Sequence, residues 1–213
     1  MKVKVITIAT YDGLGLAMLK KSMYDNNIDY VVLGQGESWK GYGMKIIETV
    51  NYLKHLSAEY THFMFVDAYD TYFLDNMKKV EEVYRNNWND KIVFSTEKAC
   101  WPNPEKSILY PLCTSPWQYL NSGGYMAPVA TFLHFISHYK PVEYTDDDQA
   151  YYTDLFLSGG IELDSECRMW QSIAFEADGD FSYNGKLKNN FTSSEPIIIH
   201  GNGRTLMDKI YKL

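Results

Sequence analysis

The sequence has only three cysteines, Cys100, Cys113 and Cys167, and none of them forms a CxxC pair. Three cysteines cannot all pair with one another, and their spacing is not that of a zinc site. One internal disulfide is possible, but the sequence favours a mostly reduced protein. A fold that depends on a disulfide framework is excluded.

The sequence also lacks a long apolar run. No stretch approaches the ~20 apolar residues of a membrane span. At the N-terminus, residues 1–9 alternate charged and β-branched residues, which is typical of a strand and too interrupted for a signal peptide. We therefore expect a soluble, unexported protein that does not associate with membranes, with the cytoplasm as the default compartment.

Basic residues are in the minority, with 20 Lys and Arg against 27 Asp and Glu and a formal net charge of −7. Nucleic-acid binders carry basic stripes, so a nucleic-acid partner is not expected. The acidic balance leaves room for a small anionic ligand held by a metal ion, and it favours a basic protein acceptor.

The length of 213 residues suits one α/β domain with a sizeable core and is too short for two enzyme domains. We therefore predict a single domain over residues 1–213. The sequence leaves the oligomeric state open, and a homo-oligomer is possible.

The first half of the chain alternates strand and helix patterns. The predicted strands are Val3–Ala9, Tyr30–Leu33, His62–Val66 and Lys91–Ser95. The predicted helices are Leu14–Tyr24, Met44–Leu56 and a third that ends near Asn87, with Asp75 as its N-cap. This order predicts a mostly parallel central sheet with helices on its faces.

The rhythm breaks after Ser95. Residues 101–116 contain four prolines and predict a long ordered loop. Residues 121–124 predict a tight turn before a short strand, and helices are expected over 129–138 and from Asp146 to Leu157. Strands are expected at 161–163 and 197–199, with a hairpin around Asn184 and Gly185.

Two carboxylates, Asp67 and Asp70, follow the apolar strand 62–66. Open α/β sheets bind ligands beyond the carboxyl ends of their strands. Carboxylates three residues apart can hold Mg²⁺ or Mn²⁺ and leave positions for diphosphate oxygens. The alternative is that both aspartates only cap the following turn.

Two further groups have both a structural and a functional interpretation. Asp146, Asp147 and Asp148 suit the N-terminus of a helix, or one of them faces a bound sugar and stabilises charge at its anomeric carbon. His200 ends an apolar strand before Gly201 and Gly203, and it is either structural or a third metal ligand.

Ordered motifs give these patterns a family context. They are Phe65–Asp70, Phe94–Pro102, Tyr119–Tyr125, Asp146–Gln149 and His200–Gly203, preceded by Leu33–Gly41 and Lys45. Together they closely resemble the N-terminal glycosyltransferase domain of procollagen lysyl hydroxylases and the related collagen glycosyltransferases. The resemblance extends from about Val3 to Gly203.

The resemblance implies a GT-A-type, Rossmann-like fold that uses Mn²⁺, with Mg²⁺ possible, and a UDP-hexose. It implies a role for each matching residue. Asp67, Asp70 and His200 would hold the metal; Trp39, Lys45, Tyr69, Asn121, Asn202 and Gly203 would bind the nucleotide sugar; Asp147, Asp148 and the loop residue Trp101 would serve transfer.

The implied reaction moves glucose from UDP-glucose onto galactosyl-hydroxylysine in collagen-like chains, with retention of configuration. A galactosyl transfer directly to hydroxylysine is the nearest alternative. A non-catalytic module that binds a nucleotide sugar or a collagen-like partner is an alternative of another class, although the intact acidic residues argue against it.

Overall fold

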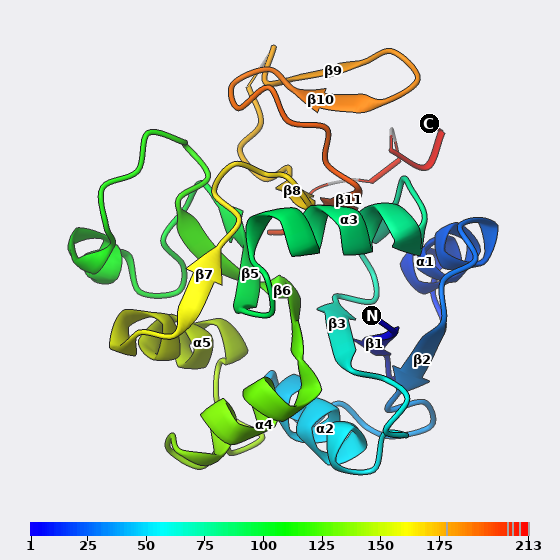
Figure 1. The fold of residues 1–213 in the computed structure, drawn as a ribbon, viewed down its shortest axis with the longest axis vertical. Helices are drawn as coiled ribbons and strands as arrows, with labels where there is room; N and C mark the ends of the chain where they lie inside the picture. Colours follow the sequence, from blue (N-terminus) through cyan, green and yellow to red (C-terminus); the bar gives the residue numbers. More distant parts are fainter. Residues whose placement is uncertain (178, 204, 206, 209, 213) are drawn as a thin grey trace.

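The computed structural model describes residues 1–177, 179–203, 205, 207–208 and 210–212. Its centre is a six-stranded sheet with the order β2-β1-β3-β6-β5-β7 (Figure 1). The strands are β1 (Val3–Ile8), β2 (Tyr30–Leu33), β3 (His62–Val66), β5 (Ile92–Glu97), β6 (Tyr119–Pro128) and β7 (Ile161–Leu163). Each of the four strands predicted in the first half of the chain is present in this sheet.

The sheet is mixed. Three of its five pairings are parallel, and the two pairings of β6 with β3 and β5 are antiparallel. The tight turn predicted at Asn121–Gly124 is wrong, because these residues lie inside β6. Two glycines are accommodated there because rings fill the space that side chains would take: a Cβ on Gly123 would meet His200, and one on Gly124 would meet Trp170.

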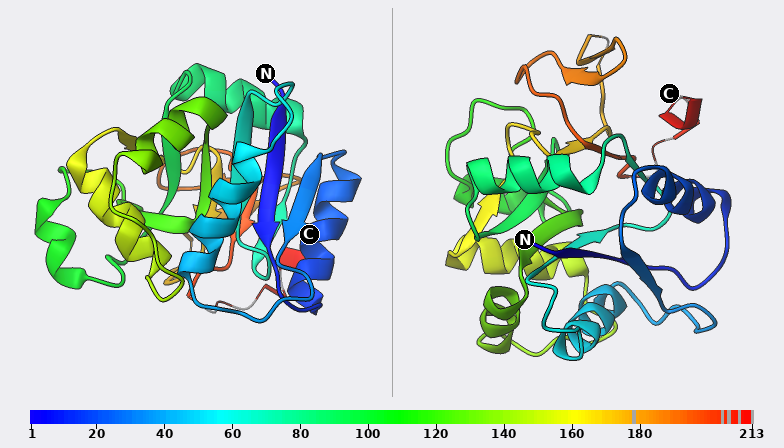
Figure 2. Two further views of the ribbon diagram at one scale, coloured as in Figure 1. Left: turned by 90° about the horizontal axis from the view of Figure 1, so that it is seen from below. Right: turned by 45° about the vertical axis from the view of Figure 1, so that its right-hand side comes forward.

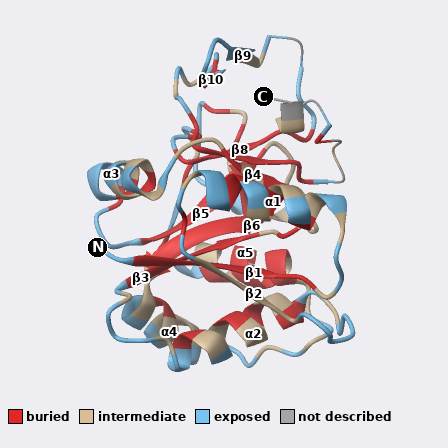
Figure 3. Ribbon diagram, turned by 90° about the vertical axis from the view of Figure 1, so that its right-hand side faces the viewer, coloured by how far each residue is buried: buried red, intermediate tan, exposed pale blue. Residues whose placement is uncertain are grey.

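Helices cover both faces of the sheet, as predicted (Figure 3). They are α1 (Leu14–Asp25), α2 (Gly43–Lys54), α3 (Met77–Asn87), α4 (Val129–Ser137) and α5 (Asp148–Ser158). Helices α2, α4 and α5 pack on one face, and α1 and α3 pack on the other.

The period-2 pattern of the central strands builds the two halves of the core. In β3, Phe63 and Phe65 pack toward α2, α4 and α5, whereas Met64 and Val66 pack toward α1 and α3. All four side chains are almost fully buried. The strand therefore brings the residue that follows it, Asp67, to a fixed position at the edge of a rigid layer.

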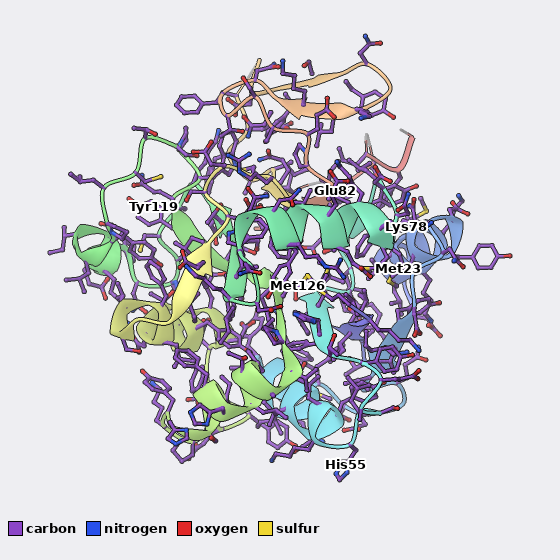
Figure 4. The ribbon with its side chains drawn as sticks, viewed as in Figure 1. Met23, His55, Lys78, Glu82, Tyr119 and Met126 are labelled. Carbon is purple, nitrogen blue, oxygen red and sulfur yellow. The ribbon has the colours of Figure 1, made fainter. Side chains whose placement is uncertain are left out.

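Helix α3 shows the amphipathic division of a surface helix (Figure 4). Lys78 and Glu82 are exposed, while the buried Met23 and Met126 lie in the core beneath the helix. The N-cap of α3 is Asn76, whose side chain accepts hydrogen bonds from the amides of Lys78 and Lys79. The predicted cap Asp75 is wrong, because its carboxylate accepts from Asn76 instead.

The helix at the aspartate run begins at Asp148, two residues after its predicted start at Asp146. Its N-cap is Asp147, whose side chain accepts from the amide of Ala150 at 2.8 Å. Asp146, the predicted start of the helix, lies outside it, and its carboxylate accepts from the amide of Glu143. Asp148 is thus the first helical residue of α5.

A second sheet of three strands, in the order β4-β11-β8, lies beside the main sheet. Its strands are β4 (Thr71–Phe73), β8 (Trp170–Ser172) and β11 (Ile198–His200). Figure 1 and the right-hand view of Figure 2 place the hairpin of β9 (Phe181–Tyr183) and β10 (Leu187–Asn189) beyond it, at one end of the molecule. This hairpin is the one predicted around Asn184 and Gly185.

The long segment from Trp101 to Pro116 is a loop, as predicted, that contains one short 3₁₀ helix, Pro104–Leu109. Among the described residues, the three cysteines are unpaired. Within the same residues, every helix is too short or too polar to cross a bilayer.

Candidate active site

Two cavities meet at the carboxyl end of β3. The first has a volume of about 560 Å³, and ten of the twelve residues singled out from the sequence line it. The second has a volume of about 420 Å³ and lies toward β1. Lys45, Asp67 and Asp70 belong to the walls of both cavities. The boundary between the cavities is therefore the predicted metal site.

The backbone fixes the predicted metal ligands from both sheets. The amide of Asp67 donates to the carbonyl of Gly123 on β6 at 2.9 Å, and the amide of Gly201 donates to the carbonyl of Asp70 at 2.7 Å. His200, the last residue of β11, stands in register with Thr71 of β4. Two strand ends thus bring residues 130 positions apart in the sequence to one place.

Asp67, Asp70 and His200 each offer one ligand atom within 4.8 Å of the others. The Nε2 atom of His200 lies 3.6 Å from Asp67 Oδ2 and 3.4 Å from Asp70 Oδ1. The ring is buried, and neither of its nitrogens has a hydrogen-bond partner within the part of the chain that the structure describes. A buried imidazole without a partner beside two carboxylates fits a divalent metal, which takes these ligand types.

The absence of a side chain at Gly123 leaves room for this ring. A Cβ built there would lie 2.1 Å from His200 Cε1, a distance that would force the imidazole to move. Gly123 is therefore required by the position of His200 and not by a turn.

Neighbouring charges shift the pKa values of His200 and Asp70. Burial opposes a charge on His200, but the carboxylates of Asp70 and Asp67 outweigh it and raise the pKa of the imidazole. Burial also disfavours the charge of Asp70, yet the neighbouring His200 lowers the pKa of that carboxyl. Asp70 and His200 thus stabilise the charged form of each other.

Lys45 of α2 joins this group to the aspartate run. Its Nζ lies 2.7 Å from Asp67 Oδ1 and 2.9 Å from Asp148 Oδ2. Burial disfavours the ammonium charge, but Asp148 and Asp67 outweigh burial and raise the pKa of Lys45. The lysine is a fixed positive charge between the predicted metal ligands and the predicted catalytic carboxylate.

The N-terminus of α2 packs tightly against the loop that precedes the aspartate run. The amide of Gly43 donates to the carbonyl of Tyr144 at 3.2 Å. A Cβ on Gly43 would lie 1.9 Å from the carbonyl oxygen of Glu143, and one on Gly41 would lie 2.2 Å from that of Tyr144. This close approach sets the distance between Lys45 and Asp148.

Glu97, the last residue of β5, is a functional candidate that sequence reasoning missed. Its buried carboxylate accepts three side-chain amide hydrogen bonds: 2.9 Å from Asn121, 2.7 Å from Gln149 and 2.9 Å from Asn202. Burial raises the pKa of Glu97 despite these donors. The sequence does contain a pattern that points to Glu97, because this residue ends an apolar strand in the same way that Asp67 follows one.

The hydrogen bonds of Glu97 tie four segments of the cavity wall together. Gln149 also donates from Nε2 to the carbonyl of Trp101 at 2.9 Å, and the amide of Ala174 donates to Asn202 Oδ1 at 2.9 Å. Asn121 and Asn202, which the resemblance places at the nucleotide sugar, thus line the first cavity with their amide nitrogens bound to Glu97.

The second cavity has an aromatic wall. Tyr69 and Tyr11 stack with ring centroids 4.4 Å apart and an angle of 11° between their planes. The Tyr69 hydroxyl accepts from the amide of Thr10 at 3.1 Å. Trp39 lies edge-on to Tyr42 at 5.8 Å, and 45% of its surface is exposed. Flat rings beside a predicted metal site suit a nucleobase.

The structure therefore divides the predicted site residues between the two cavities. Trp39 and Tyr69 line only the second cavity, and Lys45, Asp67 and Asp70 line both. The residues that line only the first cavity are Trp101, Asn121, Asp147, Asp148, His200, Asn202 and Gly203.

Comparisons with known proteins agree with this geometry. The profile of the PLOD GT domain family matches residues 1–210. A multifunctional procollagen lysine hydroxylase and glycosyltransferase of Caenorhabditis elegans is 31% identical over 220 residues, which cover 93% of this chain and 30% of the relative. The chain thus spans about a third of the length of such curated relatives.

Two solved structures share the fold. A glycosyltransferase involved in the glycosylation of the major capsid of PBCV-1 matches with a TM-score of 0.54 at 10% identity and covers all of both chains. Mouse xyloside xylosyltransferase 1 matches with a TM-score of 0.52 at 10% identity, covering 96% of this chain and 98% of that one. The predicted GT-A-type α/β fold is thereby confirmed.

Proposed function

The chain belongs to the PLOD GT domain family, and from that premise we propose that residues 1–213 form one metal-dependent hexosyltransferase domain. The donor is a UDP-hexose, with UDP-glucose favoured, and the acceptor is galactosyl-hydroxylysine in a collagen-like chain. The observation that carries the proposal is the meeting of two cavities at Asp67 and Asp70, beside His200.

Each cavity has a part in this reaction. The aromatic wall of Trp39 and Tyr69 suits the base of the donor, and the residues Asn202 and Gly203 suit the region of the diphosphate. The hexose then occupies the first cavity, whose wall carries Asp148 and Glu97. In this proposal, the part of the donor that is recognised lies in one cavity and the part that reacts lies in the other.

Asp67, Asp70 and His200 would hold the divalent cation, for which we propose Mn²⁺ with Mg²⁺ as an alternative. A bound cation neutralises the charge that builds on the diphosphate as it leaves. Lys45 adds a fixed positive charge on the same side and holds Asp67 and Asp148 at their distances.

Transfer breaks the bond between the anomeric carbon and the β-phosphate oxygen, and its electron pair leaves with UDP. The acceptor hydroxyl forms the new bond to the anomeric carbon and passes its proton to the β-phosphate oxygen that leaves with UDP. Asp148 stabilises the positive charge on that carbon, and Asp147 is a second candidate because it lines the same cavity. Trp101 excludes water that would hydrolyse the donor. We propose retention of configuration.

The decisive experiment is a panel of UDP-glucose, UDP-galactose and UDP-xylose, each with a galactosylated and a bare hydroxylysine peptide. We expect Mn²⁺-dependent transfer of glucose to the galactosylated peptide. Transfer of galactose to the bare peptide would replace the proposed step by the alternative one. If no combination of donor and peptide releases UDP, the domain is a binding module and not an enzyme.

A further inference from the structure

Phe175 is an exposed aromatic residue on the wall of the first cavity. It follows β8, 74% of its surface is exposed, and its φ is 59°. A positive φ is strained in a residue other than glycine and persists only where the surroundings impose it. Burial of the ring cannot offset this backbone strain, because the ring is mostly exposed. The conformation of Phe175 therefore needs another explanation.

Two contacts impose this conformation. The amide of Ala174 donates to Asn202 Oδ1 at 2.9 Å, and the carbonyl of Phe175 accepts from Lys98 Nζ at 3.0 Å. Lys98 is itself paired with Asp180, and it lies 4.7 Å above the ring of the buried Trp117. Both contacts connect this segment to the hydrogen bonds of Glu97. Asn202 itself donates to Glu97, and Lys98 is the next residue in the chain after Glu97.

The position of Phe175 separates it from the nucleotide. It lines the first cavity and is absent from the wall of the second, where the stacked tyrosines lie. Trp101, from a different loop, lines the same cavity and is 63% exposed. Trp101 and Phe175 thus both belong to the wall of the cavity that also carries Asp148 and Glu97, and unlike the exposed Tyr42 they line this cavity alone.

We propose that Phe175 is a specificity-determining residue that stacks on the sugar of a glycosylated acceptor. This inference rests on the proposed function. The flat face of an aromatic ring packs against the C–H groups of a pyranose, while a bare hydroxylysine side chain is flexible and charged and offers no such face. The exposed ring faces the solvent from which an acceptor arrives, whereas the donor is tethered by its diphosphate near His200.

The test is the substitution Phe175→Ala, with Phe175→Trp as its conservative partner. Phe175→Ala should raise the KM for a galactosyl-hydroxylysine peptide by about tenfold, and Phe175→Trp should restore it. The KM for UDP-hexose and the release of UDP without acceptor should stay at parental values. Phe191→Ala is the matched control, since Phe191 is 59% exposed and lines neither cavity.

Binding of the free galactosyl-hydroxylysine, measured calorimetrically with UDP and Mn²⁺ present, separates this inference from the proposed function. A parent that binds the glycosylated amino acid but lacks turnover contradicts the proposed function and leaves the stacking role testable by the same titration. A parental affinity in Phe175→Ala overturns the inference. An equal loss for the bare hydroxylysine peptide, or a raised KM for the donor, overturns it as well.

Discussion

The two sides of the first cavity are built in different ways. On the side that we propose to hold the donor, Asp67, Asp70 and His200 stand at strand ends and are partly or fully buried. Backbone hydrogen bonds within each of the two sheets hold them in place. On the side that we propose to receive the acceptor, Trp101 and Phe175 stand on loops, are mostly exposed, and are held through side chains such as Gln149 and Lys98. The donor side is fixed by the fold, and the acceptor side can change without changing the fold.

This difference separates chemistry from specificity. A substitution on the donor side removes a group that the reaction requires and should cost orders of magnitude. A substitution on the acceptor side should change which acceptor is used, at a cost of about tenfold, as expected for Phe175. Four substitutions test this comparison, in decreasing order of expected effect. They remove a predicted metal ligand, the predicted catalytic carboxylate, the space beside the ring of His200, and the charge at the N-cap of α5.

Asp67→Ala should have the largest effect. The variant lacks one of the proposed ligands and a partner of Lys45, so transfer should fall by a factor of about 10³ or more. The fold should persist because the side chain of Asp67 is partly exposed and contributes little packing. Transfer rates and thermal melts of the variant and of Asp75→Ala, a carboxylate outside both cavities, check this expectation. Parental turnover in Asp67→Ala, or activity that survives a chelator, would remove the metal from the proposal.

Asp148→Asn should come next. Asparagine keeps the shape of the side chain but removes the charge that we propose to stabilise the anomeric carbon. Transfer should fall about 10²-fold, which corresponds to ~3 kcal/mol of transition-state stabilisation. The affinity for UDP-hexose, measured by titration, should change much less, because the charge acts as the glycosidic bond breaks. An equal loss in donor affinity would mean that Asp148 serves binding through Lys45.

The donor side could be predicted from the sequence because each ligand follows a strand with a clear apolar pattern. His62–Val66 leads to Asp67, and the run Ile197–Ile199 leads to His200. The rule that ligands bind beyond strand ends then needs no three-dimensional information. The same rule applied to Ile92–Thr96 would have identified Glu97.

The features that the sequence did not predict depend on contacts between residues far apart in the chain, which a local sequence pattern does not contain. Asn121–Gly124 has the composition of a turn, yet it pairs with β3 and β5 because rings from distant segments fill the space above its glycines. Asp146 and Asp147 are equally good caps by residue type, and the backbone of Glu143 decides between them. Phe175 has no motif at all, since its exposure and its positive φ are properties of the folded loop.

Gly123→Ala tests whether the position of the His200 ring depends on the close approach of the backbone at Gly123. The added methyl group would displace the ring of His200, so the affinity of the protein for Mn²⁺ should weaken by about 10- to 100-fold. Gly124→Ala is the matched control, because its Cβ would meet Trp170 in the core instead. We expect it to lower the thermal stability and to leave the Mn²⁺ titration unchanged. Similar titrations for both variants would show that His200 is a structural residue.

Asp147→Asn should have the smallest effect of the series, and it distinguishes the two roles that the aspartate run can have. Asp147 caps α5 through one carboxylate oxygen and also lines the first cavity. Asparagine caps a helix about as well as aspartate, so the thermal midpoint should stay close to that of the parent. Because one oxygen is already engaged with Ala150, the charge at this position should contribute less to transfer than the charge at Asp148.

The transfer rate of Asp147→Asn should therefore fall by about tenfold, or ~1.4 kcal/mol, with a parental affinity for the donor. Asp146→Asn is the control, since Asp146 lies outside both cavities and bonds to the backbone of Glu143. Its transfer rate should equal that of the parent. A loss at Asp147 as large as that at Asp148 would mean that both carboxylates face the reacting carbon, whereas a parental rate at Asp147 would assign this residue to the helix cap alone.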